Sequence, residues 1–271
     1  MSLNPNPLDP GINCKPLMKH FSLIRLILIS SLACSLFACT SKKEEFLSEP
    51  LSSYLPLKKG KFITYRVDSL VFVDFQRIPE IHRYQMKHVV DDSLTDNLGQ
   101  PAWRIYTYLR DSAGTQDWTP SSTYYVTPIA DQIEVVENNL RTIKLHLPLK
   151  EGFSWFGNRY YPTDAYEPYG FTFSNDNNIK NWEFTYDNYG SFSYNGKTYN
   201  DVYTVEEADI ADNIPVTSPN VFGTRTRSVD RYQKNIGLVF RDYTLWEYQP
   251  NPNGNPFYVG WGMTMWMIDH N

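Results

Sequence analysis

Cysteine is nearly absent from this chain of 271 residues, and its three cysteines, Cys14, Cys34 and Cys39, all lie in the first 39 positions. The remainder of the chain therefore contains no thiol that could form a disulfide, act as a nucleophile or bind zinc. A domain there has to be stabilised by its hydrophobic core, which a chain of this length can supply without covalent cross-links.

The sequence also lacks a basic surplus and the short motifs of common catalytic sites. Its 25 Lys and Arg residues are outnumbered by 30 Asp and Glu residues, which gives a net charge of −5. A nucleic-acid partner is not expected, because phosphate backbones require basic surfaces. The sequence has no Gly-rich phosphate loop, no Gly-x-Ser-x-Gly and no His-Glu-x-x-His. We therefore predict no metal site, no cofactor and no catalytic activity.

Long apolar runs are missing except near the N-terminus. Residues 26–38 are mostly apolar, follow the basic Lys19 and Arg25, and lead into Leu36-Phe37-Ala38-Cys39. As a helix this run would span roughly 20 Å, less than the ~30 Å of a bilayer core, which favours a cleaved signal peptide. Its end resembles the lipobox of bacterial lipoproteins, which implies that Cys39 is acylated and begins the mature chain.

The domain organisation follows from this anchor. We predict a leader and signal peptide over residues 1–38, with the natural start at Met18, a lipidated cysteine and flexible tether over 39–53, and one β-rich domain over 54–271. Lipidation implies a lipid bilayer as partner. The run Lys42–Glu45 resembles the surface-export signal of some Gram-negative lipoproteins. We expect an outer-membrane protein on the cell surface, with the periplasmic face as the alternative.

Aromatic residues make up 15% of the chain, and they favour strands because their rings pack well on a pleated surface. Apolar and polar residues alternate over 62–72, 83–90 and 103–110, as in half-buried antiparallel strands. Asn195-Gly196 is the strongest hairpin signal, because both residues tolerate the positive φ of a type I′ turn. The predicted fold is all-β: an antiparallel sheet forming a curved half-barrel or a β-sandwich, in a single domain with long aromatic loops.

Two stretches interrupt the alternation and are predicted to be long loops, namely residues 157–181 and 206–224. The second begins with the acidic residues Glu206, Glu207 and Asp209. We expect a solvated acidic loop there, with a calcium site as the less favoured alternative, because the EF-hand spacing of carboxylates is missing.

The first loop and its flank supply the candidate binding patch. Exposed Tyr and Trp rings stack on sugars or anchor protein interfaces, so a glycan or an envelope protein is the expected partner. The alternative is that these rings pack the loop onto the sheet. The candidate residues are Trp155, Tyr160, Tyr161, Tyr166 and Tyr169.

One internal similarity stands out. Residues 55–60 read Leu-Pro-Leu-Lys-Lys-Gly and residues 147–152 read Leu-Pro-Leu-Lys-Glu-Gly. We favour the interpretation that the same turn is used twice, since the flanking sequences diverge quickly. The alternative is a duplicated unit.

The segments 54–60 and 232–239 together resemble a family of small uncharacterised lipoproteins with an N-terminal Pro-Leu-x-x-Gly and a C-terminal Tyr-x-x-x-x-Gly-Leu-Val. The resemblance covers most of residues 54–248. It implies an all-β antiparallel fold and brings no activity, cofactor or catalytic residue. Residues 249–271 depart from the pattern of that family.

Three functional hypotheses remain. The first is a non-enzymatic binding or structural module of the cell envelope. The second is a carrier of hydrophobic ligands or lipoproteins, which requires an apolar concave face. The third is a glycan-active hydrolase, for which Asp91/Asp92 and Glu206/Glu207 offer paired carboxylates.

Overall fold

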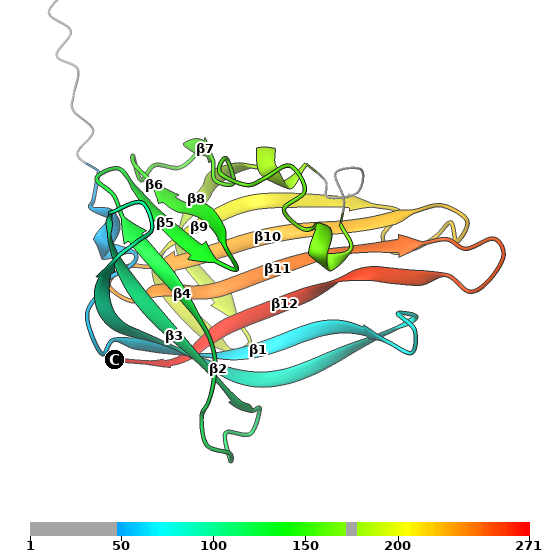
Figure 1. Ribbon diagram of the computed structural model, residues 1–271, viewed down its shortest axis with the longest axis horizontal. Coiled ribbons are helices and arrows are strands. Elements are labelled where there is room, and N and C mark those ends of the chain that lie inside the picture. Colours follow the sequence, from blue (N-terminus) through cyan, green and yellow to red (C-terminus); the bar gives the residue numbers. More distant parts are fainter. Residues whose placement is uncertain (1–47, 172–177) are drawn as a thin grey trace, which may run out of the picture. The chain divides into compact units, whose positions relative to one another are not determined.

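The computed structural model describes residues 48–171 and 178–271. The predicted signal peptide, the lipobox and Cys39 lie outside the described residues. The described chain forms one twelve-stranded sheet with the order β6-β5-β4-β3-β2-β1-β12-β11-β10-β9-β8-β7 (Figure 1). All strand pairs are antiparallel, which confirms the all-β prediction. Within these residues, no helix has the length and apolarity needed to cross a membrane.

The regular elements comprise twelve strands and three short 3₁₀ helices within the described residues. The first meander contains η1 (Leu51–Ser53), β1 (Phe62–Val73), β2 (Ile78–Thr95), β3 (Pro101–Asp111), β4 (Thr119–Pro128), β5 (Gln132–Glu137) and β6 (Leu140–His146). The second meander contains β7 (Ser154–Phe156), η2 (Glu167–Tyr169), η3 (Ile179–Asn181), β8 (Glu183–Tyr194), β9 (Lys197–Asp212), β10 (Gly223–Gln233), β11 (Gly237–Gln249) and β12 (Phe257–His270).

The sheet curls until its two edge strands, β6 and β7, meet. The amide of Ile143 on β6 donates to the carbonyl of Gly157 just after β7, over 2.9 Å. The indole Nε1 of Trp155 on β7 donates to the carbonyl of Ile143 over 2.8 Å. These two bonds define a seam where the strands approach without a ladder. The sheet is therefore nearly closed into a barrel, which covers most of its edge groups.

Both copies of the Leu-Pro-Leu-Lys-x-Gly segment occupy the same structural position. Each forms a turn with its glycine at positive φ, +82° at Gly60 and +77° at Gly152. The Gly60 amide donates to the carbonyl of Val90 on β2, and the Gly152 amide donates to the carbonyl of Tyr186 on β8. Each turn thus bonds to the second strand of a six-stranded meander that it opens. This equivalence favours the duplicated unit over a turn that is merely reused.

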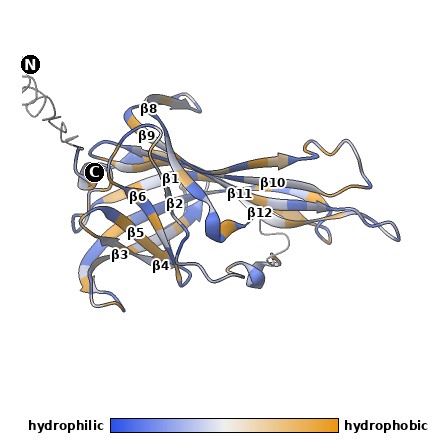
Figure 2. Cartoon of the chain, turned by 90° about the horizontal axis from the view of Figure 1, so that it is seen from above, coloured by the Kyte–Doolittle hydropathy of each residue, from blue (hydrophilic) through white to orange (hydrophobic). Residues whose placement is uncertain are grey.

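Hydrophobic and hydrophilic residues are interspersed along the strands (Figure 2), as the period-2 alternation requires. The three predicted strand segments lie within β1, β2 and β3. The turn at Asn195-Gly196 has positive φ at both residues, 47° and 77°, as expected for its type.

The predicted acidic loop at 206–224 is wrong in its first part. β9 continues through these carboxylates to Asp212, and the loop covers only residues 213–222. The strand persists because the charges have partners across it. Asp209 forms ion pairs with Arg225 and Arg227 on β10, and Glu207 faces the interior.

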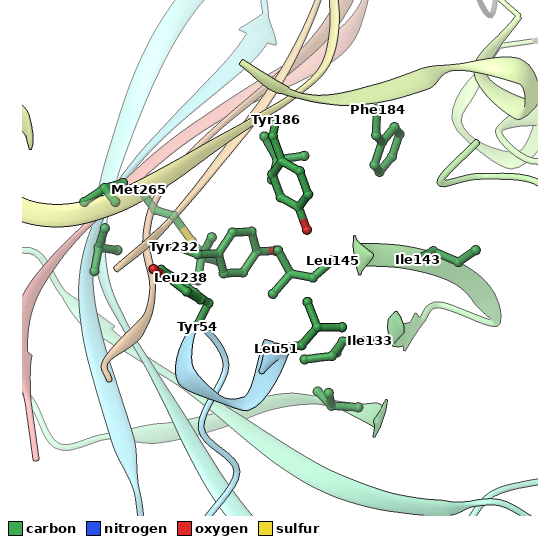
Figure 3. Packing of buried hydrophobic residues seen from close by; sticks show 14 of the residues in the cluster. Leu51, Tyr54, Ile133, Ile143, Leu145, Phe184, Tyr186, Tyr232, Leu238 and Met265 are labelled. Atoms are coloured by element: carbon green, nitrogen blue, oxygen red, sulfur yellow. The ribbon is translucent and has the colours of Figure 1, made fainter. Parts of the chain in front are cut away.

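The core begins before the predicted end of the tether. Leu51 in η1 is buried and packs in the same cluster as Tyr54, Ile133 and Leu145 (Figure 3). The described residues form one compact unit that contains all described strands together with their pairing partners. This unit therefore has its own hydrophobic core, which is what a domain needs in order to fold alone.

Candidate functional site

The interior of the sheet contains an apolar cavity of about 160 Å³. Inward side chains of β1–β5 and β10–β12, together with the turn before β1, form its wall. Apolar residues of this wall include Ile63, Met86, Ile105, Val126, Leu238 and Met265. We call this space the apolar cavity.

Two pairs of polar groups in the wall of the apolar cavity contact each other. The hydroxyl of Tyr124 and Nδ1 of His88 lie 3.1 Å apart, and the hydroxyls of Thr107 and Ser122 lie 2.7 Å apart. Burial, with a smaller contribution from the charge on Arg241, lowers the pKa of His88 to about 3. The imidazole is therefore neutral at physiological pH, and this part of the wall carries no charge.

A second space of about 270 Å³ adjoins the first. The two share four wall residues, Val135, Glu137, Arg241 and Met263. We call the second space the polar cavity, because Lys144 and other charged or hydroxyl-bearing side chains line it. Together the two cavities reach the ~300–1,000 Å³ typical of small-molecule sites.

Four buried charges meet at the polar cavity. Nζ of Lys144 lies 2.6 Å from Oε1 of Glu207 and 3.3 Å from Oδ2 of Asp230. Arg241 donates to Asp230 through Nε and Nη2, each over 2.7 Å, in a bidentate pair. The hydroxyl of Tyr232 also donates to Asp230, over 3.0 Å. The two positive and two negative charges balance.

The pKa values in this cluster reflect competition between burial and pairing. Burial opposes the charge on Asp230, but Arg241 and Lys144 outweigh it and keep the pKa of this carboxyl below its usual range. Burial also opposes the charge on Lys144, but Asp230 and Glu207 raise its pKa. At Glu207 burial prevails over the attraction of Lys144, so its pKa is raised. Glu207 is thus the member of the cluster that takes up a proton most readily.

Arg241 and Glu137 are incompletely satisfied by the protein. Nη1 of Arg241 has no hydrogen-bond partner among the described residues. The Glu137 carboxylate forms no ion pair in that part of the chain, although with Asp230 and Tyr232 it helps to raise the pKa of Arg241 against burial. Both residues line both cavities, so a free donor and a free acceptor lie where the two spaces meet.

Comparison with known proteins leaves the family open. No family model matches the chain, and no curated protein matches it. Among solved structures, it is similar to the crystal structure of a DUF1329 family protein from Desulfovibrio piger, at 10% identity and a TM-score of 0.19. That alignment covers 79% of this chain and 86% of the other. So low a score carries no argument about function, and the resemblance to a lipoprotein family stays a prediction.

The structure divides the predicted aromatic patch. Tyr161, Tyr166 and Tyr169 line the polar cavity, with ring centroids 6.2 Å and 5.8 Å apart in succession. Trp155 is buried at the seam instead. Tyr160 is exposed on the outside of the loop, where the guanidinium of its neighbour Arg159 lies 4.9 Å from the ring centroid.

Three tyrosines of the patch thus join two aromatic residues that the sequence did not single out. The centroid of Trp261 on β12 lies 5.2 Å from that of Tyr169 and 5.9 Å from that of Tyr166. The hydroxyl of Tyr243 on β11 donates to the hydroxyl of Tyr166 over 2.7 Å. The long loop therefore forms an aromatic wall of the polar cavity. Whether these rings bind a ligand stays a prediction.

Proposed function

We propose that this protein is a membrane-anchored lipoprotein of the bacterial envelope that binds the hydrophobic part of a ligand inside its barrel. The apolar cavity carries this proposal. Most of its wall residues are apolar and His88 is neutral, so an alkyl chain would meet mainly carbon and sulfur atoms. Each Å² of apolar surface removed from water contributes about 25 cal/mol, which makes such a cavity favourable for an apolar chain.

The other two hypotheses have less support. An external aromatic binding patch would need its rings on one surface, but Trp155 and Tyr160 are separated from the other three. A hydrolase would need histidine and carboxylates converging in one cleft. His88 instead contacts Tyr124 in the apolar cavity, while Glu207 and Asp230 are held in ion pairs.

The membrane anchor is part of the proposal and rests on the sequence. Acylation of Cys39 would tether the barrel to the outer membrane. The linker would be the residues between Cys39 and Ser48, which span roughly 30 Å when fully extended. A bound ligand would then stay close to the lipid surface. Cys39→Ser is expected to abolish labelling by radioactive palmitate in intact cells, and retained label would exclude this anchor. Protease treatment of intact cells would distinguish the surface from the periplasmic face.

Filling the apolar cavity tests the binding function. The segment 40–271 should bind the apolar fluorophore N-phenyl-1-naphthylamine, and 1-decanol should displace it. Val126→Phe places a ring in the cavity and is expected to weaken fluorophore binding at least about ten-fold. The matched control is Thr123→Phe, since Thr123 is an exposed residue of the same strand outside the cavity wall.

Thermal unfolding should show that both variants are folded. The proposal is contradicted if folded Val126→Phe binds the fluorophore as well as the Thr123→Phe control. It is also contradicted if the unsubstituted segment binds neither the fluorophore nor 1-decanol.

A further inference from the structure

We infer that the polar cavity binds the uncharged sugar head group of an amphiphile whose alkyl chain lies in the apolar cavity, so the ligand is of the glycolipid type. This inference rests on the proposed function, because it assumes that the apolar cavity holds the chain. It adds the chemical class of the head group, which the apolar cavity by itself leaves open.

The charge balance disfavours an anionic head group. Lys144 and Arg241 are neutralised by Glu207 and Asp230, at distances of 2.6 and 2.7 Å. An approaching carboxylate or phosphate would thus find no uncompensated positive charge in the cluster. It would also meet the negative charge of Glu137, which lines both cavities. Because Glu137 is exposed, water weakens this repulsion, and the missing positive charge is the stronger argument.

The unpaired groups fit a hydroxyl. Nη1 of Arg241 offers N–H donors, and the Glu137 carboxylate offers acceptors, with no ion pair joining the two in the described chain. A hydroxyl accepts one hydrogen bond and donates another at the same time, so it can serve both groups. An ether or ester lacks the donor, and an ammonium group lacks the acceptor. A polyol supplies several hydroxyls on one rigid ring.

The aromatic wall supplies the complementary apolar surface. Tyr166, Tyr169 and Trp261 border the polar cavity, and Tyr169 remains 47% exposed. The C–H face of a sugar ring can pack on such rings while its hydroxyls reach polar groups at the edge. Exposed tyrosine is well suited to this role, because its hydroxyl keeps one end of the ring hydrated.

The two cavities are arranged for one continuous ligand. Val135 and Met263 belong to both walls, beside Arg241 and Glu137. An alkyl chain passing Met263 would therefore carry its head group directly to the unpaired donor and acceptor. A head group on any longer polar spacer would be displaced from them.

Three probes with ten carbons in their chains separate the possibilities by calorimetry on the segment 40–271, below their micelle concentrations. These probes are n-decyl glucoside, 1-decanol and decanoate. We expect the glucoside to bind about ten-fold more tightly than 1-decanol, equivalent to roughly 1.4 kcal/mol. We expect decanoate to bind more weakly than the glucoside.

Two variants locate the head group. Tyr169→Ala should reduce glucoside affinity about five- to ten-fold and leave 1-decanol affinity unchanged. Tyr160→Ala is the matched control, because it removes a tyrosine of the same loop that is equally exposed, 47%, but lies outside the cavity. Glu137→Gln, at an exposed position, should weaken the glucoside and strengthen decanoate.

The outcomes are distinct. If decanoate binds most tightly, or the glucoside binds no better than 1-decanol, the head-group inference is overturned and the proposed function stands. Equal effects of Tyr169→Ala and Tyr160→Ala on the glucoside also overturn the inference. If none of the three probes binds, the proposed function fails as well.

Discussion

The apolar cavity and the polar cavity share the strands β5, β11 and β12, yet their linings are opposite in chemistry. On β11, Leu238 lines the first, Tyr243 lines the second, and Arg241 lines both. Alternation places Arg241 and Tyr243 on the same inward face, and the irregular β10–β11 pairing between Leu238 and Phe240 brings Leu238 to that face as well. Position along the strand then decides which cavity they reach. One barrel can therefore combine an apolar and a charged compartment without a second domain.

The two cavities also differ in how their wall residues contribute to the stability of the fold. Burial of the apolar wall stabilises the fold, whereas buried ion pairs often contribute little, because desolvation offsets their attraction. The cluster of Lys144, Glu207, Asp230 and Arg241 is therefore a poor choice for stability alone. Its position beside a cavity is consistent with a role in binding.

The largest expected effect is the loss of one charge from the cluster. Asp230→Asn leaves Arg241 without its bidentate partner and Lys144 with one carboxylate fewer. We expect the free energy of unfolding to fall by about 3–5 kcal/mol, because an uncompensated charge stays buried. Urea denaturation of the segment 40–271, followed by tryptophan fluorescence, measures this change.

The control comes from the apolar cavity. Ile105→Ala should cost only about 2 kcal/mol, the low end for such a truncation, because Ile105 already borders empty space. The double variant Lys144→Met with Glu207→Leu removes both signs together and should cost less than Asp230→Asn. A smaller loss for Asp230→Asn than for Ile105→Ala would remove the energetic contrast between the cavities.

A smaller, pH-dependent effect is expected from His88. Its pKa is lowered from 6.5 to about 3 in the folded protein, so the neutral ring stabilises the fold above pH 6.5. This stability is lost as the pH falls toward the folded pKa, and we expect a loss of about 2–3 kcal/mol on reaching about pH 4. The groups around the ring are Tyr65, Tyr124, Met86 and the charge on Arg241.

His88→Gln keeps a partner for Tyr124 but cannot be protonated in this range. Unfolding free energies of both proteins, measured from pH 7 to pH 4, should therefore diverge, with a flatter profile for the variant. Parallel profiles would mean that the apolar cavity does not hold His88 neutral.

Sequence reasoning predicted the strands well where one face is buried. β1 and β3 alternate regularly, and Asn195-Gly196 tolerates the positive φ of its turn. Sequence reasoning failed at Glu207, because a charged residue within a run of polar residues is typical of a loop. The available signal was the alternation itself: Val205 and Glu207 are two positions apart and both are buried.

The interior site was harder to predict because it depends on distant pairings. Lys144 meets Glu207 and Asp230 only when β6 comes round to β9 and β10, on the other side of the interior. No local pattern encodes that closure. The same limit applies to the aromatic patch, where Trp155 and Tyr169 look alike in the sequence but face different surroundings.

The seam can be compared with the other junction between the two six-stranded meanders. In a ring of two repeats, the last strand of each repeat adjoins the first strand of the other, so β12–β1 and β6–β7 are corresponding junctions. The first is a full antiparallel ladder. At the second, one backbone bond and the indole of Trp155 join β6 to β7. The Tyr186 hydroxyl also bonds to the backbone of His146, and Lys144 forms its ion pairs across the same junction. Opening the second junction would therefore leave all eleven strand ladders of the described residues intact, and its cost would lie in side-chain contacts and the ion pairs of Lys144.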